Sequence, residues 1–85
     1  MAQLRVTRVG NGLHPSEVIV SVETADGGRE EVMLDQVTLS ERSTIEIGNP
    51  ISKDAGRSLV ELPRETARGS WRVWVPNEAL DEIAA

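Results

Sequence analysis

The sequence predicts a mainly β fold, α+β only at its margin: a single antiparallel β-roll or small barrel of about five to six strands with a short C-terminal helix. Short segments rich in Val, Ile and Thr alternate apolar with polar residues, and turn-forming residues separate them. A helical spacing of apolar residues occurs only at the C-terminal end. The 85 residues are enough for one domain, residues 1–85, with a modest core.

The first predicted strand covers residues 3–9, where Leu4, Val6 and Arg8 share one face. An Asn-Gly turn ends it, because both residue types tolerate positive φ. The next strand covers residues 17–24 and places three valines on a buried face, namely Val18, Val20 and Val22, with Glu17, Ile19, Ser21 and Glu23 on the other. A turn containing two glycines then returns the chain in an antiparallel direction through residues 29–34.

Three shorter strands are predicted in the second half of the chain. The apolar spacing changes phase after Leu34, which predicts a bulge or corner there. A strand over residues 44–47 ends at a Gly-Asn-Pro turn, and a polar loop is expected through residues 53–56. The last two strands are predicted over residues 58–62 and 70–75.

A short helix is predicted after Pro76, with Asn77 as its N-cap. It would have about two turns and would need to pack on the sheet, since so short a helix is unstable alone in water. The apolar residues at helical spacing are Ala79, Leu80, Ile83 and Ala84.

Trp71 and Trp74 are the only Phe, Tyr or Trp residues of the chain. Strand alternation sends residues three apart to opposite faces, so both rings cannot belong to one apolar layer. Trp71 shares parity with Val73 and Val75, which predicts that Trp71 is in the core. Trp74 is then expected at the surface beside Arg72.

Composition excludes several functional classes. The net charge of −5 disfavours a protein that coats nucleic acid or anionic membrane with its whole surface. No segment approaches the roughly 20 apolar residues of a membrane span, so no membrane contact is expected. The absence of Cys excludes disulfides and thiolate metal sites, and is typical of a cytoplasmic protein, the location expected here.

No catalytic residues, cofactor or metal ligands are predicted. His14 is the only imidazole and lies in a Gly- and Pro-bounded loop, so neither a zinc site nor a Ser-His-Asp triad is expected. Glu30 and Glu31 are adjacent on a strand and point to opposite faces, unlike the paired carboxylates of a glycosidase. The glycine clusters lack a P-loop ending. We therefore expect the protein not to be an enzyme.

The candidate binding residues are Arg64, Arg68, Arg72 and Trp74, in a mildly basic segment between two acidic ones. Trp and Arg are enriched in protein interfaces, which favours a small non-enzymatic protein-interaction domain whose partner is another protein or a second copy in a homodimer. The alternative is a weak nucleic-acid-binding domain that uses residues 57–74. For the Arg72 and Trp74 pair, the pattern favours a purely structural role, in which the arginine covers the ring, over a binding role.

Overall fold

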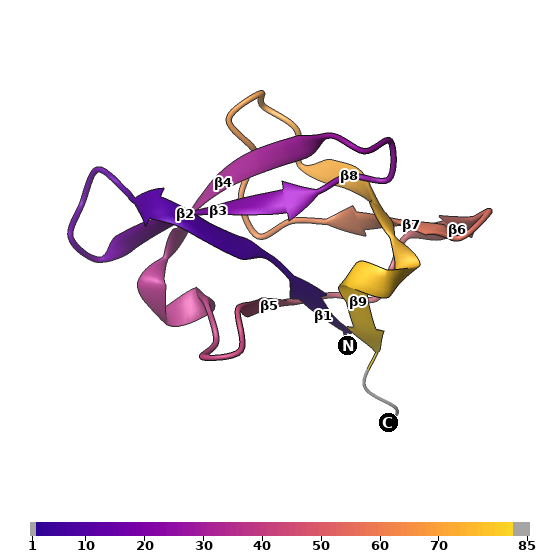
Figure 1. Ribbon diagram of the computed structural model, residues 1–85, viewed down its shortest axis with the longest axis horizontal. Coiled ribbons are helices and arrows are strands. Elements are labelled where there is room, and N and C mark those ends of the chain that lie inside the picture. The colour runs from indigo at the N-terminus through magenta and orange to yellow at the C-terminus, as the bar shows by residue number, and fades with distance from the viewer. Residues whose placement is uncertain (1, 83–85) are drawn as a thin grey trace.

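The computed structural model describes residues 2–82 and measures 38 × 29 × 17 Å along its principal axes. Nine short strands form three antiparallel three-stranded sheets within this range (Figure 1). The predicted mainly β, antiparallel fold is thus confirmed. The sheets do not close into a barrel, so the predicted roll or small barrel is not confirmed. No helix within residues 2–82 has the length and apolar character needed to cross a membrane.

The first sheet has the order β2-β3-β4, with β2 at Thr7–Asn11, β3 at Glu17–Glu23 and β4 at Arg29–Asp35. β3 and β4 pair along their whole length, which confirms the predicted hairpin. A register shift interrupts the pairing of β2 with β3. The predicted inward face of β3 is buried as expected, and consists of Val18, Val20 and Val22.

The turn between β3 and β4 is closed by side-chain hydrogen bonds. The Thr24 hydroxyl donates to Asp26 Oδ1, and the Gly28 amide donates to the same oxygen over 3.0 Å. Because these bonds favour the charged carboxylate, chiefly the bond from Thr24, the pKa of Asp26 lies below its ordinary value. Gly27 has φ of +86°, a conformation that glycine adopts without a Cβ clash.

The second sheet brings distant segments together in the order β5-β1-β9, with β1 at Ala2–Arg5, β5 at Thr44–Ile47 and β9 at Leu80–Glu82. The predicted strand over residues 3–9 is therefore divided between two sheets. The predicted corner after Leu34 is also present, as a short 3₁₀ helix (η1, Gln36–Thr38).

The third sheet has the order β6-β7-β8, with β6 at Ser52–Asp54, β7 at Arg57–Glu61 and β8 at Arg72–Pro76. The polar loop predicted through residues 53–56 is wrong in part, because β6 pairs with β7 in a hairpin that projects from one end of the molecule (Figure 1). All residues of β6 are exposed, so this strand lacks the apolar alternation by which strands are predicted.

One apolar core joins the three sheets. It consists almost entirely of aliphatic side chains, since neither Trp is buried within it. The Ala25 amide donates to the Trp74 carbonyl over 2.8 Å and ties the β3-β4 turn to β8. The largest fully buried apolar side chains are Leu4, Leu34, Ile45, Val18, Val20, Val22, Val32, Val60 and Val75.

The predicted C-terminal helix is wrong over the described residues. After β8 the chain makes one 3₁₀ turn (η2, Asn77–Ala79) and then enters β9, where Leu80 pairs with Leu4. A two-turn helix is unstable in water without tertiary partners, whereas the three residues of β9 pair directly with β1. Asn77 does not cap a helix with its side chain; its Oδ1 accepts a 2.6 Å hydrogen bond from the buried Ser58 hydroxyl. Ile83 and Ala84 lie outside the described residues.

Candidate interaction surface

The four predicted binding residues fall into two groups. Arg72 and Trp74 lie on the outer face of β7 and β8. The residues that alternate with them in β8, Val73 and Val75, are buried. Arg64 and Arg68 belong instead to the segment 63–70, which connects β7 to β8 and runs beside β4.

Each of the three arginines faces a carboxylate of the same chain. The distances are 3.3 Å from Arg64 Nη1 to Glu17 Oε2, and 3.4 Å from Arg72 Nε to Glu61 Oε2. Arg68 Nη1 lies 3.5 Å from Oε2 of Glu30, whose side chain is only 11% exposed. The arginines therefore do not form an uncompensated positive site.

Trp74 is partly buried, contrary to the prediction that it is the exposed ring. It lies opposite Leu59 in the β7-β8 register, and the Arg57 guanidinium carbon is 4.5 Å from its ring centroid. Arg57 also lies 3.4 Å from Asp54. An arginine covers this ring, as the structural interpretation expected, but it is Arg57 and not Arg72. Arg57 lies diagonally opposite Trp74 across the β7-β8 pair.

Trp71 is the exposed ring, at 52% of its surface, so its predicted place in the core is wrong. It has the parity of Val73, and its carbonyl still accepts a 2.8 Å hydrogen bond from the Leu62 amide. The residue lies in a bend just before β8, however, where strand alternation no longer sets the direction of its side chain. Trp71 instead lines a hollow of about 310 Å³ with Met33, Arg64 and Glu65.

A second hollow, of about 300 Å³, adjoins the first and shares Met33 and Glu65 with it. Its floor includes Ile19 and Met33, which are direct cross-strand partners on the outer face of β3 and β4. Ala67 contributes one wall. Four of the apolar residues that line these two hollows are not buried, and we call them the Trp71 patch: Ile19, Met33, Ala67 and Trp71.

The buried Thr66 organises the segment that carries the patch. Its Oγ1 accepts hydrogen bonds from the amides of Arg68 (3.3 Å) and Ser70 (3.1 Å). Gly69, with φ of +86°, completes the turn by donating from its amide to the Thr66 carbonyl over 2.8 Å. The Ala67 amide donates to the Glu31 carbonyl over 2.8 Å, which fixes the segment to the edge of β4.

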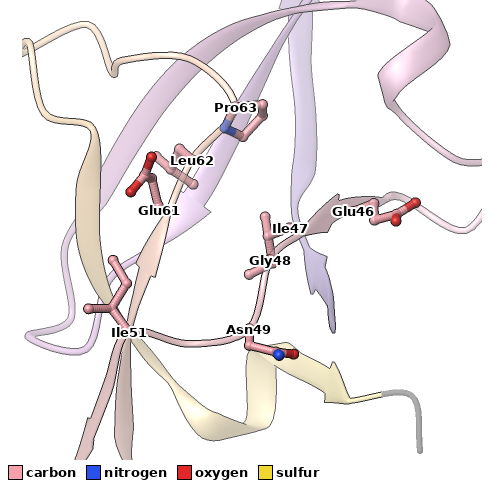
Figure 2. Close-up of a pocket in the computed structure, with 8 residues that line it drawn as sticks. All are labelled: Glu46, Ile47, Gly48, Asn49, Ile51, Glu61, Leu62 and Pro63. Carbon is pink, nitrogen blue, oxygen red and sulfur yellow. The ribbon is translucent and has the colours of Figure 1, made fainter. Parts of the chain in front are cut away.

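The largest hollow, of about 550 Å³, is a groove between the end of β7 and the segment after β5 (Figure 2). Its apolar walls are Ile47, Ile51, Leu62 and Pro63. Figure 2 shows the Glu46 side chain directed away from the groove. The remaining carboxylate, Glu61, is the one paired with Arg72, so the groove contains no convergent acid, base and nucleophile.

The chemistry-bearing residues elsewhere in the described chain are similarly isolated. The His14 ring makes its hydrogen bonds with Ser16, 2.8 Å from Nδ1 to Oγ and 3.2 Å to the Ser16 amide. Within residues 2–82, no three His, Asp or Glu side chains gather closely enough to hold a metal ion. The exposed apolar surface at Trp71 is thus the feature that most requires a functional explanation.

Comparisons with protein-family models, with curated proteins and with solved structures find no match to this chain.

Proposed function

We propose that the protein is a small non-enzymatic protein-interaction domain that docks its partner on the Trp71 patch. One observation carries the proposal: a large aromatic ring is half exposed beside a methionine, next to a segment that five backbone or hydroxyl hydrogen bonds hold in place. Trp, Met and Arg are the residue types enriched at interfaces, and a preorganised ring loses little conformational entropy on binding.

Polar residues surround the patch in the manner of an interface rim. Arg64 and Glu65 border the hollow at Trp71, and Glu31 borders the neighbouring hollow. An apolar centre with a charged rim excludes water from the contact that carries most of the binding energy. A partner that covers Trp71 would therefore gain from burial of the ring more than from the rim.

Nucleic-acid binding by residues 57–74 is the less favoured proposal. Phosphate would have to displace Glu17, Glu30 and Glu61 from the three arginines, or bind against those carboxylates. Titration with short mixed DNA and RNA separates the two proposals, because phosphate contacts weaken steeply with salt and apolar contacts do not. Salt-sensitive NMR shifts gathered at Arg64, Arg68 and Arg72 would favour nucleic acid.

Site-specific photo-crosslinking in the native cell tests the interaction. A photoreactive residue at position 67 lies within the patch, and one at exposed position 52 on β6 serves as the matched control. We expect one discrete adduct from position 67, none from position 52, and loss of the adduct in Trp71→Ala. Equal adducts from both positions, or an adduct that persists in Trp71→Ala, would refute the proposal.

The mass of the adduct distinguishes a second copy of the chain from a different protein. We also propose self-association to a homodimer, a cytoplasmic location and the lack of catalytic activity, and only the sequence supports these three points. The Trp and Arg residues support self-association, the lack of Cys supports the location, and the single His supports the lack of catalysis. Adducts of twice the mass of the chain would identify the homodimer.

A further inference from the structure

We infer that the Trp71 patch receives a segment of another protein in which an apolar side chain lies between two basic ones. The inference rests on the proposed interaction function and adds the chemistry of the partner. It depends on the charges around the hollow above Ile19 and Met33, where both ionisable residues in its lining are glutamates, Glu31 and Glu65.

Glu31 lies on the same outer face as Met33, two residues before it on β4. Its cross-strand partner is the neutral Ser21, and its exposed carboxylate makes no ion pair among residues 2–82. Arg29, two residues before Glu31 on this face of β4, lies opposite Glu23 in the register; it lines a neighbouring hollow with Glu31 but does not line the hollow above Ile19 and Met33. The Glu31 charge is thus available to a partner at the rim of the hollow.

Glu65 lines both hollows of the patch and is exposed. It too makes no ion pair in the described part of the chain, whereas its neighbour Arg64 faces Glu17 at 3.3 Å. Arg64, the base that lines the hollow at Trp71, is therefore ion-paired within the chain, whereas Glu31 and Glu65 are not ion-paired within residues 2–82. This asymmetry gives the apolar hollow a negative rim, to which Lys or Arg side chains are complementary.

The exposed Trp71 ring adds a second reason for a basic partner. Ammonium and guanidinium groups are attracted to the face of an indole, and Arg57 already uses Trp74 in this way within the chain. A partner base that approaches Glu65 would also reach Trp71, because the two residues line one hollow. An apolar side chain between the bases would fill the space above Ile19 and Met33.

Three acetylated and amidated pentapeptides test the inference: Lys-Ala-Leu-Ala-Lys, its charge-reversed form Glu-Ala-Leu-Ala-Glu, and Lys-Ala-Ser-Ala-Lys without the central apolar residue. In an extended peptide, the first, third and fifth side chains share one face. Indole NMR shifts report binding, with the Trp71 signal as the probe. The Trp74 signal is an internal control, because Arg57 covers that ring and because Trp74 belongs to the β6-β7-β8 sheet, whereas Ile19 and Met33 belong to the β2-β3-β4 sheet.

Two double variants separate local from overall charge. Glu31→Gln/Glu65→Gln alters the patch, and Glu41→Gln/Glu46→Gln alters two exposed acids outside it. Each removes two negative charges and changes the net charge from −5 to −3. A result that depends on net charge alone would be the same in both.

We expect Lys-Ala-Leu-Ala-Lys to bind about ten-fold more tightly than either other peptide, as two exposed charge contacts or one buried leucine would give. The Glu31 and Glu65 variant should lose most of the preference for lysine over glutamate, and the control variant should keep it. Equal loss in both variants would overturn the inference, as would equal binding of the two lysine peptides.

Failure of the inference can be told from failure of the proposed function. Equal shifts of Trp71 with the lysine and glutamate peptides would overturn the basic partner and leave an apolar docking site. If no peptide shifts Trp71 but the crosslink from position 67 still depends on Trp71, the partner chemistry is wrong and the interaction stands. Absence of both signals would refute both.

Discussion

Replacing Thr66 with Val should loosen the segment that presents Trp71, at little cost in volume. The substitution removes Oγ1, which accepts two hydrogen bonds of 3.3 and 3.1 Å from the Arg68 and Ser70 amides. A neutral hydrogen bond contributes roughly 0.5 to 1.5 kcal/mol, and these two are long. We therefore expect Thr66→Val to lower the free energy of unfolding by about 1 to 2 kcal/mol.

Urea unfolding measures the global loss, and amide hydrogen exchange locates it. The Arg68 and Ser70 amides should exchange about 5 to 30 times faster in Thr66→Val, the factor that corresponds to 1 to 2 kcal/mol. Thr66→Ser is the matched control, because it keeps the hydroxyl and loses only a methyl group. Unchanged exchange at both amides, or equal acceleration in the Ser variant, would refute the role assigned to the hydroxyl.

Three further predictions concern burial and pH. Trp71→Ala should lower the free energy of unfolding by about 1 to 2 kcal/mol, less than Trp74→Ala and less than the roughly 3 to 5 kcal/mol expected for a core tryptophan. Equal and severe losses from both substitutions in chemical denaturation would contradict this order. Leu34→Ala, at a side chain 1% exposed, should cost about 2 to 5 kcal/mol, whereas Leu13→Ala, at one 94% exposed, should change the unfolding midpoint little. Asp26 has a lowered pKa, so its stabilising effect is present above the ordinary aspartate range and is lost as the pH falls through the lowered value. Asp26→Asn should therefore flatten the acid side of the pH-stability curve, and a parallel curve displaced at all pH values would contradict that cause.

The strands were most predictable where one local signal agreed with the tertiary environment. β3 is such a case, because alternating valines and a glycine turn specify both the strand and its antiparallel neighbour. β6 carried no apolar alternation, since all of its residues are exposed, and its existence depends on pairing with β7. The C-terminal segment had a helical spacing, but residues 80–82 pair with the edge of β1 that β5 leaves free.

The candidate site was predictable only in its residue types. Parity correctly distributed the faces of β8 but could not show where the core ends, so Trp71 and Trp74 were interchanged. The ion pairs of the arginines and the approach of Arg57 to Trp74 join residues that are distant in the chain or diagonal in a register. Met33 and Trp71 line one hollow because the connection between β7 and β8 runs beside β4. No local spacing of residues in the sequence indicates that path.

The position of β1 has a consequence for synthesis of the chain. This strand is synthesised before both of its neighbours in the sheet, which span residues 44–47 and 80–82. The hairpin of β3 and β4 can form early, because its contacts are local. The sheet around β1 cannot be completed until residue 82 has been made, so nascent chains should expose Leu4 and the edge of β1 to chaperones until that point.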